Sequence, residues 1–196
     1  MEKTLTIGVL AMQGGFREHI ASLTKLGVKT KRVREAKDLQ NLAGLIIPGG
    51  ESTAIGKLLR ETDLIKPLRQ KITAGLPTWG TCAGLILLAN EIEAETPYLD
   101  VIDIIVRRNA YGRQIDSFRT DLLIPEIDPQ NKIPLVFIRA PFITGAGPDV
   151  KILATYNGRI IAARQNNILV TSFHPELTDD LRVHNYFMEI CRQDVK

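Results

Sequence analysis

Short apolar runs alternate with segments of helical periodicity through the first half of the chain, and this alternation constrains the fold most. Residues 5–10, 28–33, 45–47 and 78–80 are predicted strands, and residues 15–26, 52–60, 64–74 and 85–90 are predicted helices. The order strand, helix, strand, helix implies βαβ units. The pattern therefore predicts an α/β fold with a mostly parallel central sheet and helices on both faces.

The second half of the chain contains many strands and few helices. Residues 178–191 are a predicted C-terminal helix with Thr178 as its cap, and Asp179 and Asp180 stand where the helix dipole favours anions. We expect extra antiparallel strands appended to the sheet. We find no internal repeat or linker, so residues 1–196 are expected to form a single domain. The strands predicted here are residues 101–106, 118–124, 135–139, 151–155, 160–164 and 168–173.

Composition excludes several classes of protein. Hydrophobic residues make up 44% and charged residues 24% of the 196 residues, which argues against a disordered chain, a coiled coil or a membrane protein. A net charge of +3 is weak for a nucleic-acid binder. Two cysteines are too few for a disulfide framework. We interpret residues 7–12 as a strand rather than a signal peptide. No run reaches the ~18 apolar residues of a membrane span. We expect a cytoplasmic protein without nucleic-acid or membrane partners.

The segment Gly80-Thr81-Cys82-Ala83-Gly84 joins a predicted strand to a predicted helix. Small flanking residues allow a tight turn that lifts the Cys82 sulfur above the sheet edge, close to a helix N-terminus that favours the thiolate. The N–H of Ala83 would then donate to an oxyanion. The alternative is a buried structural cysteine in a glycine-rich turn. For Cys191, on the apolar side of the last helix, we expect that passive core role.

Among the three histidines, His174 stands out because it ends a buried strand, where open α/β sheets place their sites. Pro175 favours extended backbone at His174, so Glu176, two residues on, can accept a hydrogen bond from one ring nitrogen. The other nitrogen would take the cysteine proton. The alternative is a turn that enters a helix. His19 and His184 are expected to be surface or packing residues.

Residues 48–53, Pro-Gly-Gly-Glu-Ser-Thr, follow a buried strand and open a helix. The two glycines allow N–H groups to turn toward a ligand or an oxyanion. The spacing fits neither the Walker A loop nor the Rossmann glycine pattern. The alternative is a plain turn with Ser52 as the helix cap.

These segments together resemble the class I, triad-type glutamine amidotransferases, and within them the glutaminase subunit of pyridoxal 5′-phosphate synthase. That branch carries Gln-Gly-x-x-Arg-Glu-His, here residues 13–19, and Phe-Ile-Arg-Ala-Pro, here residues 137–141. It also carries Arg-Asn-x-x-Gly-Arg-Gln-x-Asp-Ser-Phe, here residues 108–118, and Ser-Phe-His-Pro-Glu-Leu-Thr-Asp-Asp, here residues 172–180. The resemblance covers essentially the whole chain and implies a flavodoxin-like fold.

The resemblance implies hydrolysis of L-glutamine to glutamate and ammonia through a glutamyl thioester, with no cofactor and no metal. The ammonia would pass to a synthase subunit that builds pyridoxal 5′-phosphate and docks near Gln13. Cys82 would be the nucleophile, with His174 and Glu176 completing the triad. Gly50 and Ala83 would form the oxyanion hole. The glutamine-binding residues would be Gly50, Glu51, Ser52, Arg108, Ile138 and Arg139.

The sequence departs from this branch at Ala110-Tyr111, Phe142 and Trp79, where Ser-Phe, His and Phe are usual. Three other functions remain open at this stage. One is a glutaminase that serves another acceptor, as in imidazole glycerol phosphate synthase, although residues 108–118 favour the vitamin B6 branch. Another is a cysteine hydrolase of similar fold. The third is a binding module that uses the basic residues 25–37, which a lysine-protected edge strand explains better.

Overall fold

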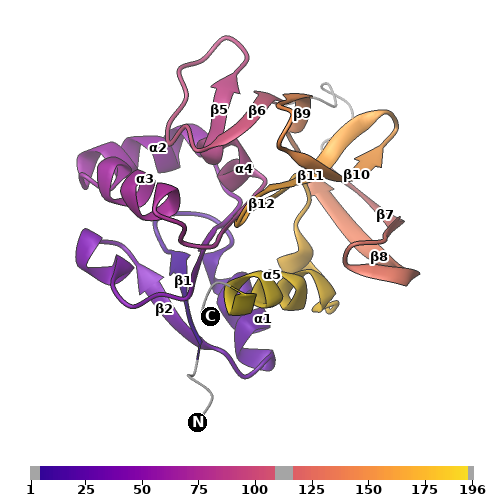
Figure 1. Cartoon of the computed structure of the whole chain (residues 1–196), viewed down its shortest axis with the longest axis horizontal. Coiled ribbons are helices and arrows are strands. Elements are labelled where there is room, and N and C mark those ends of the chain that lie inside the picture. Colours follow the sequence, from indigo (N-terminus) through magenta and orange to yellow (C-terminus); the bar gives the residue numbers. More distant parts are fainter. Residues whose placement is uncertain (1–4, 109–116, 194–196) are drawn as a thin grey trace.

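The computed structural model describes residues 5–108 and 117–193. Its central feature is a parallel half-sheet with the strand order β2–β1–β3–β4–β12 (Figure 1). This is the flavodoxin-like order, which places a ligand crevice beyond the carboxyl ends of the strands. Strands β3, β4 and β12 are buried along their whole length, as expected for parallel strands covered on both faces. The strands span Thr6–Leu10 (β1), Lys29–Val33 (β2), Gly44–Ile47 (β3), Thr78–Thr81 (β4) and Ile168–Thr171 (β12).

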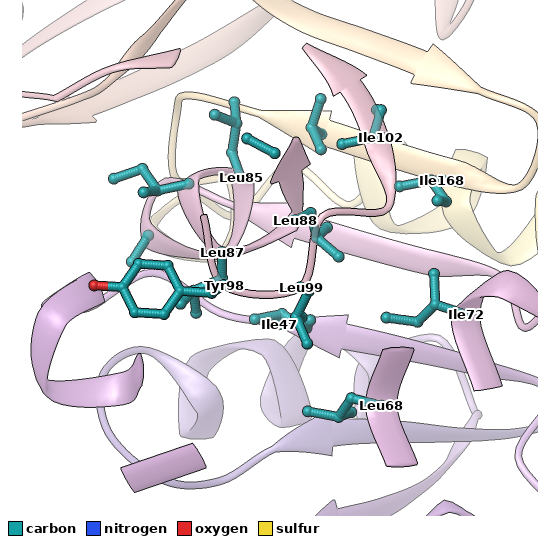
Figure 2. Close-up of a cluster of buried hydrophobic side chains, with 14 of the residues drawn as sticks. Ile47, Leu68, Ile72, Leu85, Leu87, Leu88, Tyr98, Leu99, Ile102 and Ile168 are labelled. Carbon is teal, nitrogen blue, oxygen red and sulfur yellow. The ribbon is translucent and has the colours of Figure 1, made fainter. Parts of the chain in front are cut away.

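Helices cover both faces of this half-sheet, so the predicted α/β class is confirmed (Figure 1). Helices α1 and α5 enclose one buried cluster around Trp79. Helices α2, α3 and α4 enclose the other, which includes Ile47, Leu85, Leu88 and Leu99, with Leu99 beside Ile47 (Figure 2). The helices span Phe16–Lys25 (α1), Ser52–Glu61 (α2), Ile65–Thr73 (α3), Ala83–Leu88 (α4) and Arg182–Gln193 (α5), with a short 3-10 helix at Ala36–Leu39 (η1).

The predicted antiparallel strands of the second half are also present. Strand β11 pairs antiparallel with β12, β9 and β10, and β6 pairs antiparallel with β9 and parallel with β5. Strands β7 and β8 form a separate two-stranded hairpin. The strands span Ala89–Ile92 (β5), Ile102–Arg107 (β6), Ser117–Ile124 (β7), Asp128–Ile138 (β8), Phe142–Ala146 (β9), Lys151–Tyr156 (β10) and Arg159–Gln165 (β11).

The structure differs from the prediction at α4, β8 and β9. Helix α4 ends at Leu88, and β5 begins at Ala89, where the backbone turns to extended angles and pairs with β6. Strand β8 begins at Asp128, because its polar first residues extend the β7–β8 hairpin. Strand β9 was not predicted.

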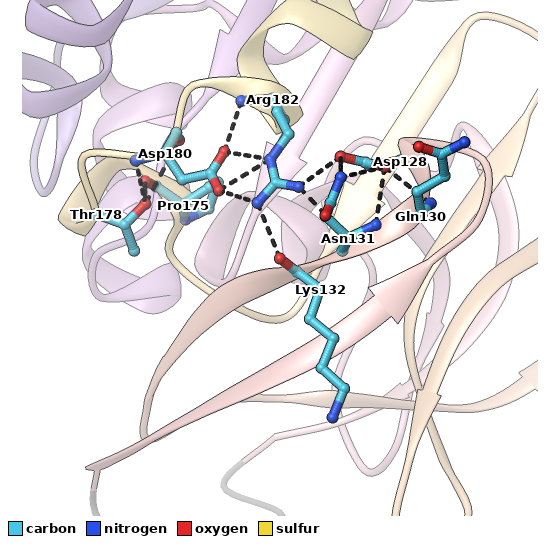
Figure 3. A network of polar contacts seen from close by, with 8 residues as sticks. All are labelled: Asp128, Gln130, Asn131, Lys132, Pro175, Thr178, Asp180 and Arg182. Carbon is cyan, nitrogen blue, oxygen red and sulfur yellow. Dashed lines mark hydrogen bonds and ion pairs between the residues drawn. The ribbon is translucent and has the colours of Figure 1, made fainter.

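The start of the last helix also differs from the prediction. Residues Pro175–Leu177 form a 3-10 turn (η2), and Thr178 accepts a hydrogen bond from the N–H of Asp180 instead of capping the helix. The Asp180 carboxylate accepts from the N–H of Arg182, where α5 begins. The Arg182 guanidinium binds Asp180, Asp128 and the carbonyl of Lys132 (Figure 3). This network ties the β7–β8 hairpin to the segment that follows η2.

Strand β2, which carries Lys29 and Lys31, lies at the edge of the sheet, as the edge-strand interpretation predicts. Within residues 5–108 and 117–193, no helix is long and apolar enough to cross a membrane.

Candidate active site

The carboxyl ends of β3, β4 and β12 meet at a cavity of about 420 Å³. Every predicted site residue lines this cavity except Glu176, which lies behind His174. A larger cavity of about 870 Å³ opens between α1 and the β7–β8 hairpin and does not contain Cys82. The smaller cavity is lined by Gln13, Gly50, Glu51, Ser52, Cys82, Ala83, Ile86, Arg108, Ile138, Arg139 and His174.

Cys82 occupies a strained turn between β4 and α4. Its backbone φ of 48° and ψ of −100° lie in a region that side chains rarely adopt. A Cβ at Gly84 would lie 1.9 Å from the carbonyl oxygen of Ile47, and one at Gly80 would lie 2.6 Å from the backbone of Gly84. Larger residues would therefore clash at both positions, as the predicted tight turn around the cysteine requires.

His174 and Glu176 form the predicted hydrogen bond. His174 Nδ1 lies 2.7 Å from Glu176 Oε1, and the Glu176 side chain is 1% exposed. The route differs from the prediction, because η2 rather than extended backbone brings the two side chains together. Burial raises the pKa of Glu176, but the neighbouring imidazoles of His19 and His174 outweigh it and lower that pKa, so the carboxylate is ionised.

The His174 imidazole and the Cys82 side chain line the same cavity and interact electrostatically. Burial lowers the pKa of His174, but hydrogen bonds and charge interactions with Cys82 and Glu176 outweigh burial and raise it to about 10. Cys82 is 6% exposed, and its Sγ lies 4.0 Å from the carbonyl oxygen of Ile138. The raised pKa keeps the His174 imidazole in its charged form at neutral pH.

The loop after β3 lies against both groups. A Cβ at Gly49 would come within 2.4 Å of the His174 ring and 3.3 Å of Cys82 Cβ, so the backbone itself packs there. The Gly49 carbonyl oxygen accepts from the N–H of Gly15 at 3.0 Å. Because the peptide is trans, the N–H of Gly50 points the opposite way. The orientation of this one peptide therefore sets the direction in which the Gly50 N–H points.

Glu51, not Ser52, caps helix α2. Its carboxylate accepts from the N–H groups of Thr53 and Ala54, and the Arg108 guanidinium lies 3.1 Å away. Burial raises the pKa of Glu51, but these two hydrogen bonds and the charge of Arg108 outweigh burial. The pKa of Glu51 is therefore lower than that of a free glutamate. The freed Ser52 hydroxyl lines the cavity, is buried, and has no hydrogen-bond partner within the described residues.

The two predicted arginines differ in their surroundings. Arg108 donates to both carboxylate oxygens of Glu95, at 2.7 and 2.8 Å, as well as to Glu51. Arg139 is exposed at the cavity rim, with a backbone φ of 42°. Gln13 also lies at the rim, where its side-chain oxygen accepts from the N–H of Glu51 at 2.8 Å.

The prediction for His19 and His184 missed a contact with the site. Both are fully buried, and His19 Nε2 lies 3.4 Å from the second Glu176 oxygen. A signal was present, because His19 lies three residues after Phe16 and four before Leu23, on the buried side of α1. Cys191 is fully buried in the cluster beneath α5, which confirms its predicted core position.

The departures from the family pattern lie at different depths. Phe142 is in β9 beneath the guanidinium groups of Arg107 and Arg159 and does not line the cavity. Trp79 is fully buried and stacks edge-on against His19. Ala110-Tyr111, and most of the motif at residues 108–118, lie outside the described residues. No cluster of metal-ligating side chains occurs in the part of the chain that the structure describes.

A cysteine on a strand-to-helix turn, beside a carboxylate-bound histidine at the end of a parallel sheet, is typical of α/β enzymes with a cysteine nucleophile. Residues 9–193 match the SNO glutamine amidotransferase family, and the chain belongs to that family. The predicted family and enzyme class, a glutamine-hydrolysing amidotransferase, are therefore confirmed.

The chain is similar to known proteins over nearly its full length. The chain is 59% identical to the pyridoxal 5′-phosphate synthase subunit PdxT of Clostridium kluyveri, over 96% of this chain and all of that protein. It is 51% identical to the PdxT subunit of Haemophilus influenzae, over 96% and 99%. A crystal structure of a glutamine amidotransferase is 46% identical with a TM-score of 0.88, over 95% and 98%. The structure of PurLQS from Thermotoga maritima, 15% identical with a TM-score of 0.69 over 99% and 100%, shares the fold.

Proposed function

We propose that this chain is the glutaminase subunit of a pyridoxal 5′-phosphate synthase. It hydrolyses L-glutamine to L-glutamate and ammonia and delivers the ammonia to a synthase subunit, in the cytoplasm. The names of the PdxT relatives support the assignment of the partner. The observation that carries the chemistry is the strained Cys82 in contact with a His174 that is bound to a buried carboxylate.

In this proposal the Cys82 thiolate attacks the side-chain amide carbon of glutamine, and the carbonyl oxygen becomes an oxyanion. The N–H groups of Ala83 and Gly50 stabilise that oxyanion. His174 gives its proton to the amide nitrogen, the C–N bond breaks, and ammonia leaves a γ-glutamyl thioester. Water then attacks the thioester, His174 takes its proton, and glutamate and the thiolate are released. Glu176 orients His174 and stabilises its charged form throughout.

The cavity offers a matching set of groups for a free amino acid. The exposed Arg139 suits the α-carboxylate, and the ionised Glu51 suits the α-ammonium. Arg108 is held by its hydrogen bonds to Glu95, and it donates to the Glu51 carboxylate and so fixes its position. The unpartnered Ser52 hydroxyl supplies a further hydrogen bond to bound glutamine.

The synthase subunit is proposed to dock over the cavity mouth, where Gln13 is exposed and binds the N–H of Glu51. Docking there would act on the loop that carries Gly50. The direct test measures ammonia release from glutamine by the chain with and without the synthase subunit. Release that depends on Cys82 supports the proposal, and no release even with the synthase subunit would overturn it.

A further inference from the structure

A buried imidazole network lies behind Glu176 and reaches the loop at Gly49. His19 Nε2 lies 3.4 Å from Glu176 Oε2 and 3.2 Å from Thr81 Oγ1. His19 Nδ1 lies 3.0 Å from His184 Nε2. His19, Thr81 and His184 are all fully buried. The proposed mechanism uses only the Glu176 oxygen that faces His174, so it assigns no role to this network.

The contacts indicate which nitrogen of His19 carries the proton. Burial lowers the pKa of His19, and burial also lowers the pKa of His184 to about 3, so both rings are neutral and each carries one N–H. Oxygen Oε2 of Glu176 has no hydrogen-bond partner within the described residues. A lone pair of His19 aimed at that anion would be repelled by it. The proton is therefore on Nε2, and Nδ1 accepts from the Nε2–H of His184.

Thr81 extends the network to the other parts of the site. It directly precedes Cys82 in the chain, and its hydroxyl oxygen accepts from the N–H of Gly49 at 2.9 Å. His19 is thus in contact with the carboxylate behind His174 and with the residue that fixes both the cysteine turn and the glycine loop. The other charged groups that act on His19 are His174 and Glu18.

We propose that His19 is a positioning residue for glutamine hydrolysis. Its neutral Nε2–H stabilises the ionised Glu176 carboxylate in the orientation that supports His174, and its contact with Thr81 ties that carboxylate to the Cys82 turn. His184 holds His19 in the required tautomer. The inference rests on the proposed triad and adds His19 and His184 as residues that support Glu176.

The test compares His19→Phe, which keeps a ring but has no N–H, with His19→Gln, which keeps an amide donor. Leu23→Ala is the matched control, because Leu23 is fully buried in the same helix and belongs to the hydrophobic cluster. The first readout is the pH dependence of Cys82 alkylation by iodoacetamide without glutamine, with peptide mapping to separate Cys82 from Cys191. The second is kcat and KM for glutamine in the presence of the synthase subunit.

In His19→Phe the Glu176 carboxylate loses the polar ring that lies 3.4 Å from its Oε2 and protonates more readily, so the imidazolium and thiolate lose support. We expect the alkylation midpoint to move to higher pH, and kcat to fall by about 10-fold to 100-fold with KM unchanged, as for other residues that orient a functional histidine. His19→Gln should recover part of both effects. Leu23→Ala should lower the melting temperature and leave the alkylation midpoint where it is in the wild type.

An unchanged alkylation midpoint in a folded His19→Phe variant would overturn the proposal and leave His19 a packing residue. If that variant does not fold, His184→Phe provides the test, because it removes the group that holds the His19 tautomer. The alkylation midpoint should then move in the same direction, but by less. An unchanged midpoint in His184→Phe would count against the proposal. Absence of ammonia release by the wild type, with midpoints that move as expected, would refute the proposed function and leave only the part of the inference that concerns how His19 positions Glu176 and the Cys82 turn.

Discussion

Replacement of Glu176 by Gln isolates the contribution of one buried carboxylate to the reaction. Its Oε1 accepts from His174 Nδ1 at 2.7 Å, and the side chain is 1% exposed. A hydrogen bond to a charged group contributes about 1.5–3 kcal/mol. In the proposed mechanism, the imidazolium that this bond stabilises is the proton donor for the departing ammonia. Since each 1.36 kcal/mol is a tenfold change in rate, we expect kcat to fall by about 10-fold to 160-fold.

The KM for glutamine should change little, because Glu176 does not line the cavity that holds Cys82, where we propose that glutamine binds. The assay is ammonia release over a range of glutamine concentrations with saturating synthase subunit, which separates kcat from KM. Asp179→Asn is the matched control, because it removes a fully exposed carboxylate three residues away, paired only with Lys25 at the surface. A raised KM with an unchanged kcat would refute the reasoning and make Glu176 a ligand for the substrate.

Three further predictions concern activation, acid stability and packing. The synthase subunit should raise kcat for glutamine hydrolysis by at least about tenfold, which is within what one oxyanion donor can supply. Gln13→Ala should weaken this stimulation. An isolated chain that already works at the full rate of the complex would contradict the prediction. Because the pKa of His184 is about 3 in the folded chain and 6.5 in the unfolded one, the unfolded chain binds the extra proton, and stability should fall as pH drops below about 6.5. His184→Phe should flatten that fall in urea unfolding, and an unchanged slope would count against it. Gly84→Ala should lower the free energy of unfolding by about 1–3 kcal/mol or more, because its Cβ would lie 1.9 Å from the Ile47 carbonyl; an unchanged urea midpoint would contradict this.

Local sequence patterns predicted the parallel half of the sheet well. Strand β3, for example, is a short apolar run that stops at Pro48 and is followed by the helical repeat of α2, so the hydrophobic pattern and the turn residues predict the same elements. The antiparallel half was harder. The polar start of β8 pairs only with β7, and β9 pairs with strands distant in the sequence, so neither has a local signal. The apolar residues 85–90 fit a helix or a buried strand equally well, and the boundary at Ala89 depends on pairing with β6.

The site shows the same division. Cys82, His174 and Glu176 were predictable because each stands at a strand end with distinctive neighbours. The alternative of a helix cap at Ser52 is wrong, because Glu51 caps α2, and the choice between the two depends on how the chain enters the helix. His19 was underrated because its importance comes from a contact with a residue 157 positions further along the chain, which no local pattern encodes.

The most direct test of the central claim is covalent labelling of the two cysteines by a glutamine-mimicking electrophile, followed by peptide mapping. Cys82 lines the cavity together with His174, whereas Cys191 is a fully buried residue of α5. The account predicts label on Cys82 alone, protection by excess glutamine, and a Cys82→Ala variant that binds glutamine without releasing ammonia. Label found chiefly on Cys191, or ammonia release that persists in Cys82→Ala, would contradict the assignment of Cys82 as the nucleophile.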